Sequence, residues 1–267
     1  MRILILGCSH TAGAWGKKNY LNEYIPDSSI FKKVLQSKFK CHYDSGWSVH
    51  LANEYNQHTF YTFSHIGGGI LNYIATISNL FKLYGQNYFD KVIVQHTDEL
   101  RFTSYNYIEG SSFIENFPES IDTQTKTKYN NIKIFDYSQI NKRLRNKLVP
   151  TSNVIVPFLN TEYMYKYIFK DFVNEELFGT FKKKYDSLSY KSVYLKFIAD
   201  GFMYILKHLH DSIYSFNWNQ VEDRINNQEK NLYNQLISRG DGRHLDIEGC
   251  ELMYQLFKND LREFIEK

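Results

Sequence analysis

Two short segments near opposite ends of the chain carry residues suited to nucleophilic chemistry. Residues 7–11 read Gly-Cys-Ser-His-Thr and follow the apolar run Ile3–Leu6. Close to the other end the chain reads Asp-Gly-Arg-His, with Asp241 and His244 three positions apart. A serine hydroxyl is inert near neutral pH and attacks a carbonyl only when a base removes its proton. An imidazole is such a base when a carboxylate accepts a hydrogen bond from its other ring nitrogen.

These residue types predict a catalytic triad in which Ser9 attacks, His244 removes and returns the proton, and Asp241 orients the imidazole. Singly, a serine can cap a helix, an aspartate can form a turn and a histidine can be a satisfied polar group. The combination of a serine at a strand end with Asp-x-x-His before a helix favours catalysis. His10 is predicted to be a bystander because side chains of adjacent residues diverge, and Cys8 a small packed side chain.

An acyl-transfer site also needs hydrogen-bond donors for the oxyanion. The backbone N–H of Ser9 is one candidate. Gly67 and Gly68 belong to a glycine triplet behind a second strand-like segment, where the backbone can approach a substrate closely. Asn72, one turn further on, offers a side-chain amide. The triplet also suits a strand-to-helix turn, and both interpretations can hold together.

The elements that must position these residues alternate along the chain. Short apolar segments of strand character alternate with amphipathic helical stretches, which predicts an α/β fold with a mostly parallel central sheet and helices on both faces. Ligands of such sheets bind beyond the carboxyl ends of the strands, where Ser9 is expected. The predicted strands are 3–6, 58–66, 91–96 and 212–216, and the predicted helices are 46–55, 70–84 and the last helix after residue 246.

The last helix is marked by an expected cap and an expected buried stripe. Asp246 is expected to cap the helix, and its buried stripe is expected to be Cys250, Met253, Phe257, Leu261 and Ile265.

Residues 102–150 are polar and lack a long periodic run, which predicts an insertion or lid over the strand ends. Residues 161–210 show helical spacing and predict additional helices. With no repeat and no Gly/Ser linker, 1–267 is interpreted as a single domain.

The composition limits the classes of partner. Net charge is only +3, from 32 basic and 29 acidic residues, which is too mild to indicate nucleic acid or an anionic membrane. The apolar run 3–6 is shorter than the roughly 7 to 15 residues of a signal-peptide core, and no apolar run approaches the about 18 needed to span a bilayer. The three cysteines form no CxxC pair. The chain is therefore expected to be cytoplasmic, without a membrane or nucleic-acid partner.

Aromatic residues make up 17% of the chain, with 22 Tyr and 20 Phe. Such residues can stack on sugars, but their even spread along the sequence is more typical of a biased genome composition. The aromatic content alone therefore does not identify a sugar-binding surface.

Other chemistries fit the sequence less well. An α/β-hydrolase elbow needs Gly-x-Ser-x-Gly, but Thr11 stands at the second glycine. No Gly-Lys-Ser/Thr follows the first strand, which excludes a phosphate-binding P-loop. The nine histidines lack a zinc spacing, and His208 and His210 would point to different sides of a helix. No metal and no cofactor are predicted.

Four segments resemble the four sequence blocks of the SGNH, or GDSL-like, hydrolases: ILILGCSHT, SHIGGGILN, KVIVQHTDELR and DGRHLDIEG. The resemblance implies a three-layer flavodoxin-like fold and hydrolysis of esters, often acetyl or other acyl groups on sugars or lipids, without a metal. By this likeness Ser9 corresponds to the nucleophile, His244 to the base and Asp241 to its partner. Gly67 or Gly68 corresponds to the oxyanion glycine.

The third block departs from the family pattern. The family has Gly-x-Asn-Asp there and uses the Asn in the oxyanion hole, whereas this chain has Gln-His-Thr-Asp, with Thr97 in the Asn place. Thr97, Asn72 or His96 remain as alternative donors, and loss of one oxyanion donor costs about 10²- to 10³-fold in rate. Cys8 and His10 stand where the family commonly has Asp and an apolar residue.

The stretch HTDELR is also similar to a subgroup of such proteins found in viral and environmental sequences, with a Thr and a downstream Arg in this block. That likeness makes Arg101 a candidate for binding a substrate carboxylate or phosphate through two parallel hydrogen bonds. A surface salt bridge with Asp98 or Glu99 is an equal alternative.

Together the residues and the resemblance predict a serine ester hydrolase that works through an acyl-enzyme on a small-molecule or glycan ester, with carbohydrate O-acetyl groups preferred. An O-acyltransferase with the same acyl-Ser9 intermediate remains open. So does a non-catalytic glycan-binding or assembly protein that retains the fold.

Overall fold

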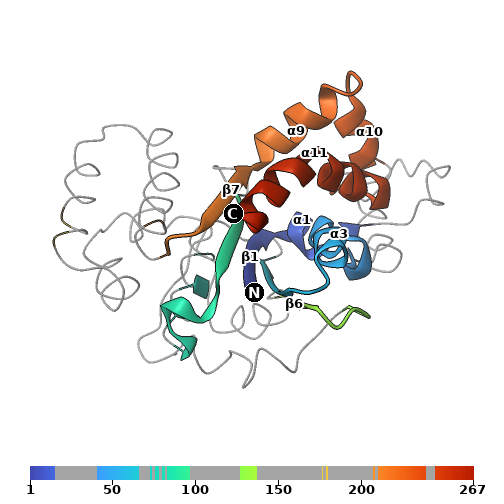
Figure 1. Cartoon of the computed structure of the whole chain (residues 1–267). Helices are drawn as coiled ribbons and strands as arrows, with labels where there is room; N and C mark the ends of the chain where they lie inside the picture. The colour runs from blue at the N-terminus through green and yellow to red at the C-terminus, as the bar shows by residue number, and fades with distance from the viewer. Residues whose placement is uncertain are drawn as a thin grey trace, which may run out of the picture.

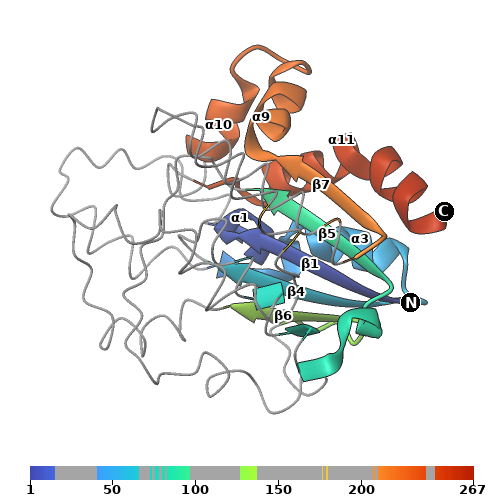
Figure 2. The same cartoon turned by 90° about the vertical axis from the view of Figure 1, so that its left-hand side faces the viewer.

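The computed structural model describes residues 1–15, 41–65, 83–96, 127–136, 210–238 and 244–267, together with residues 73, 76, 77, 80, 81, 176, 179 and 207. Within this part of the chain, five parallel strands form one sheet in the order β6-β4-β1-β5-β7 (Figures 1 and 2). The strands are β1 (Arg2–Cys8), β4 (Thr59–His65), β5 (Lys91–His96), β6 (Ile132–Asp136) and β7 (Ile213–Asn217). Figure 2 shows their carboxyl ends at one edge.

The strand order matches the predicted fold class. When β6 is left out, the strands lie in the order β4-β1-β5-β7 across the sheet. Numbered by their order along the chain, these four strands read 2-1-3-4, which is the arrangement of flavodoxin-like sheets. β1 lies in the middle, paired with β4 on one side and β5 on the other. The prediction of an α/β fold with a parallel central sheet between helices is confirmed. All four predicted strands are present.

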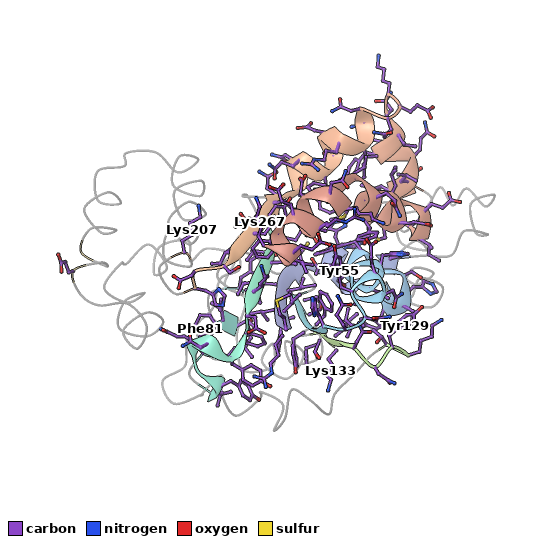
Figure 3. The ribbon with its side chains drawn as sticks, viewed as in Figure 1. Tyr55, Phe81, Tyr129, Lys133, Lys207 and Lys267 are labelled. Atoms are coloured by element: carbon purple, nitrogen blue, oxygen red, sulfur yellow. The ribbon has the colours of Figure 1, made fainter. Side chains whose placement is uncertain are left out.

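β6 is an edge strand that the sequence analysis did not predict. It falls inside the segment 102–150, which was expected to contain only an insertion or lid. Ile132 and Ile134 are buried against the sheet, and β6 pairs with β4 from Phe60 to Ser64. Five residues with Lys133 between the two isoleucines carry too short an alternating pattern to stand out (Lys133 is labelled in Figure 3). Most of 102–150 and of the predicted helical region 161–210 lies outside the described residues.

One face of the sheet is covered by α3 (Trp47–Glu54) and α11 (Ile247–Glu266), which pack against each other (Figure 1). Ile3, Ile5, Phe60 and Ile93 project into this core from register-aligned positions. Figure 3 labels Tyr55 at the end of α3, and its hydroxyl donates a hydrogen bond to Glu266 Oε1 at 3.3 Å. The hydrogen bond joins the end of α3 to the last turn of α11 on this side of the sheet.

The opposite face is also apolar. Leu4, Leu6 and Phe63 alternate with the residues of the first face and are buried. The described residues between 73 and 84 are helical, as predicted for 70–84, and Ile77 and Phe81 are buried (Phe81 is labelled in Figure 3). The remaining described elements are α1 (Ser9–Ala12), β2 (Ala14–Trp15), β3 (Cys41–His42), the 3₁₀ turns Tyr43–Ser45 and Gln86–Tyr88, α9 (Trp218–Asn226) and α10 (Leu232–Ser238).

α11 follows the prediction closely. The Asp246 side chain caps it by accepting a hydrogen bond from the Gly249 N–H at 2.8 Å. All five residues of the expected stripe are buried: Cys250, Met253, Phe257, Leu261 and Ile265. The burial and the cap fix where the helix begins, three residues after His244. In the described residues, no helix has both the length and the apolar character needed to cross a membrane.

Replacing the cap tests how α11 is anchored. We expect Asp246→Ala to lower the free energy of unfolding by about 1 kcal/mol, because the Gly249 N–H loses its acceptor. Asp246→Asn keeps a capping oxygen and should lose less. Urea unfolding measures both, with the exposed Glu263→Ala in the last turn of the same helix as the control, expected to change stability by less than about 0.5 kcal/mol. Equal losses in all three variants would contradict the role of the cap.

Candidate functional site

Ser9 lies where the sequence analysis expected it, beyond the carboxyl end of β1. The strand ends at Cys8, which has extended backbone angles, and α1 begins at Ser9 (Figure 2). Ser9 is fully buried. Because β1 is the central strand, Ser9 is flanked by the ends of β4 and β5.

His244 Nε2 lies 2.8 Å from Ser9 Oγ, although the two residues are 235 positions apart in sequence. The distance is that of a hydrogen bond. In the tautomer with the ring hydrogen on Nδ1, the serine hydroxyl donates to Nε2, and the imidazole is then placed to accept the serine proton.

His10, predicted to be a bystander because its side chain diverges from that of Ser9, lies beside His244. Its ring stacks on that of Trp218, with centroids 3.7 Å apart and planes 26° apart. The His10 ring also lies 4.9 Å from the ring of His244, tilted by 47°. The Trp218 indole N–H in turn donates to the Tyr233 hydroxyl. The neighbouring rings of His10 and Trp218 limit the space in which the His244 ring can rotate.

Trp218 and Tyr233 were missed as site residues because no local motif marks them. One signal was present: Trp218 follows the last strand β7 directly, and therefore lies at the same sheet edge as Ser9. Residues that follow parallel strands converge at one edge of the sheet, and this holds for Trp218 after β7 as it does for Ser9 after β1.

His96, the last residue of β5, is buried at the same edge. Burial lowers the pKa of its imidazole to about 4, because the charged form loses its hydration. The ring is therefore neutral at neutral pH and keeps one N–H donor. Extending the β1–β5 register beyond Leu6 and Val94 sets His96 opposite Cys8.

Six of the predicted site residues lie outside the described part of the chain: Asp241, Gly67, Gly68, Asn72, Thr97 and Arg101. Their contacts stay predictions. The described strands show where their segments start, since β4 ends at His65 and β5 at His96, on either side of β1. The described ends of β4 and β5 thus lie on either side of the end of β1.

Cys8 is buried between the flanking strands and packs as the small side chain that was predicted. Among the residues that the structure describes, no group of three or more His, Cys, Asp or Glu side chains is placed to hold a metal ion. The described distance between Ser9 Oγ and His244 Nε2 is suited to proton transfer between the two side chains.

No protein-family model, no curated protein and no solved structure matches this chain.

The buried His96 predicts a loss of stability in acid. The unfolded chain takes up a proton on this residue below its ordinary pKa of 6.5, while the folded protein does so only below about 4. Between these values the unfolded state binds more protons, so stability falls as the pH falls. This residue should make the protein about 2 kcal/mol less stable at pH 4.5 than at pH 7.

The variant His96→Gln should remove that part of the pH dependence. Urea unfolding of both proteins at pH 7 and pH 4.5 measures it, and the difference between variant and wild type is the quantity of interest. A difference that is the same at both pH values would show that His96 is not buried in a neutral form.

Proposed function

We propose that this protein is a serine ester hydrolase that works through an acyl-enzyme, with Ser9 as the nucleophile and His244 as its base. The observation that carries the proposal is the 2.8 Å distance between His244 Nε2 and Ser9 Oγ at the carboxyl edge of a parallel sheet. The resemblance of four sequence segments to the SGNH hydrolases supports the same roles for the same two residues.

In the first half of the reaction Ser9 Oγ forms a bond to the ester carbonyl carbon while its proton passes to His244 Nε2. The carbonyl electron pair moves onto the oxygen and generates the oxyanion. Collapse of this intermediate breaks the bond to the alcohol oxygen, which leaves with the proton from His244. The acyl group then remains on Ser9.

In the second half a water molecule attacks the acyl-enzyme and gives its proton to His244 Nε2. The second oxyanion collapses, the bond to Ser9 Oγ breaks, and Ser9 recovers its proton from His244. A carboxylic acid is released, and the protein returns to its starting state without a metal or a cofactor.

In this proposal the oxyanion accepts hydrogen bonds from the backbone N–H of Ser9 and from the backbone N–H of Gly67 or Gly68. Thr97, Asn72 or His96 is the candidate for the remaining donor, because Thr97 stands where the SGNH pattern has Asn. Each donor of this kind contributes about 10²- to 10³-fold in rate, so the identity of the last donor sets how active the protein is.

Two groups restrain the base in this proposal. Asp241 accepts the hydrogen bond from His244 Nδ1, as the spacing in the sequence predicts. The His10 ring, backed by Trp218, packs beside the His244 ring and opposes its rotation. With both in place, the imidazole keeps Nε2 directed at Ser9.

The proposed substrates are small acyl esters. By family likeness we favour acetyl or other small acyl esters of carbohydrates or related molecules, with Arg101 available for an anionic substrate group. Transfer of the acyl group to an alcohol instead of water would use the same acyl-Ser9 intermediate. Analysis of products formed with and without an added alcohol acceptor distinguishes hydrolysis from transfer.

A fluorophosphonate probe tests the nucleophile directly, because it phosphonylates only an activated serine. We expect the wild-type protein to be labelled at Ser9 and Ser9→Ala not to be labelled. His244→Gln should label at least about 10²-fold more slowly, since it removes the general base. Ser238→Ala is the matched control, because this serine is exposed, lies on α10 and should not affect labelling. A wild-type protein that never labels would contradict the proposal and favour a non-catalytic binding protein.

The pH dependence of hydrolysis tests the base. The rate on a generic acetyl ester should rise with pH, because a general base can accept the serine proton only in its unprotonated form. The measurement is kcat/KM for a nitrophenyl acetate across the acidic and neutral range. Retention of the same rising limb by His244→Gln would show that another group is the base.

A further inference from the structure

The turn that carries Ser9 cannot hold its own shape. α1 contains only the four residues Ser9–Ala12, so it makes few internal hydrogen bonds. It is followed at once by Gly13, whose positive φ of 144° ends the helix. Whatever places Ser9 Oγ against His244 must therefore come from outside the turn.

Gln95 on β5 supplies a contact from outside. Its side-chain oxygen Oε1 accepts a hydrogen bond from the Thr11 hydroxyl, two residues after Ser9. The same oxygen accepts a second bond from the Trp47 indole N–H at 3.0 Å. An indole N–H can only donate, so the oxygen of the Gln95 amide must be the atom on this side. All three residues are buried.

Gly7 makes the contact possible. A β-carbon at position 7 would lie 1.8 Å from Thr11 Oγ1, so the Thr11 side chain occupies the space that any side chain at position 7 would fill. From there it reaches across the central strand to the neighbouring strand. Extending the β1–β5 register beyond Leu6 and Val94 sets Gln95 opposite Gly7. The Thr11 carbonyl oxygen also accepts a bond from Ser48 Oγ at 3.5 Å.

The two ends of the Gln95 amide differ in their hydrogen bonding. The oxygen Oε1 is shared by two buried donors, the Thr11 hydroxyl and the Trp47 indole N–H. Among the described residues, its Nε2 group is buried and has no hydrogen-bond partner. An unpaired buried polar group costs about 1 to 3 kcal/mol, so turning the amide over or removing it would leave both donors without an acceptor at a similar cost each. The orientation of the Gln95 oxygen toward Thr11 is therefore fixed by its surroundings.

We propose that Gln95 is a positioning residue of the site: through Thr11 it holds the four-residue turn so that Ser9 Oγ meets His244 Nε2. Gln95 touches neither Ser9 nor His244 in the described contacts and acts through Thr11. This inference rests on the proposed function for its effect on the rate, because a displacement of about 1 Å at a reacting group costs about 10²-fold.

The two hydrogen bonds to Gln95 Oε1 supply a matched pair of variants. Thr11→Val removes the bond to the Ser9 turn and keeps the shape of the side chain, whereas Trp47→Phe removes the other bond to the same oxygen and leaves the turn attached. We expect Thr11→Val to lower kcat and the rate of fluorophosphonate labelling at least about tenfold, with little change in KM. Trp47→Phe should lower them less than about threefold, although it removes more buried surface and lowers the thermal midpoint more.

Gln95→Met and Thr11→Ser complete the set. Gln95→Met removes the accepting oxygen at similar volume and should lose as much kcat as Thr11→Val. The double variant Gln95→Met/Thr11→Val should lose little more than either single variant, because both remove one interaction. Thr11→Ser keeps the hydroxyl and should restore most of the rate. If kcat falls in all variants in proportion to the thermal midpoint, Gln95 has a structural role only and the proposal is overturned.

A readout without turnover separates this inference from the proposed function. The ¹⁵N signals of the His244 ring in the folded protein report whether Nε2 accepts a hydrogen bond, with Ser9→Ala as the reference for its loss. We expect Thr11→Val and Gln95→Met to shift these signals toward those of Ser9→Ala, and Trp47→Phe to leave them near the wild type. That result supports the positioning role even if the wild-type protein hydrolyses no ester. Unshifted signals in Thr11→Val would overturn it even if the protein is an active hydrolase.

Discussion

The short contact between Ser9 and His244 joins the first strand of the chain to the loop before its last helix, and the rest of the described structure serves to make that contact possible. Its geometry depends on two long-range packings. β1 must lie in the middle of the parallel sheet, so that its end faces the site, and α11 must dock so that its first residue falls just after His244. The buried stripe of α11 and the Asp246 cap provide that docking.

Two kinds of interaction hold the two partners of this contact. Next to Ser9, the Thr11 hydroxyl donates a hydrogen bond to Gln95, and both side chains are buried. Next to His244 lies the ring of His10, which also stacks on Trp218. Hydrogen bonds restrict direction and ring packing restricts rotation, so both kinds of contact bear on the distance and the angle between Ser9 Oγ and the His244 ring.

The parallel sheet explains why residues from distant segments meet at this edge. All five described strands end on the same side, so the residue after each strand is brought near the residues after its neighbours (Figure 2). Ser9 follows the central strand, His96 ends β5, and Trp218 follows β7. The segments with the predicted oxyanion donors leave β4 and β5 at the same edge. A neutral buried imidazole at His96 is in keeping with a site that excludes water.

Local periodicity was enough to predict four strands, the cap and stripe of α11, and the α/β class, because burial of alternating or helically spaced apolar residues is written into short windows of sequence. Residue chemistry was enough to single out Ser9 and His244 as partners. β6 was missed because an edge strand of five residues carries little pattern. The stacking of His10 and the hydrogen bonds of Gln95 were decided by the tertiary structure alone, since both depend on which side chains meet across strands and helices far apart in the chain, and no local spacing records that.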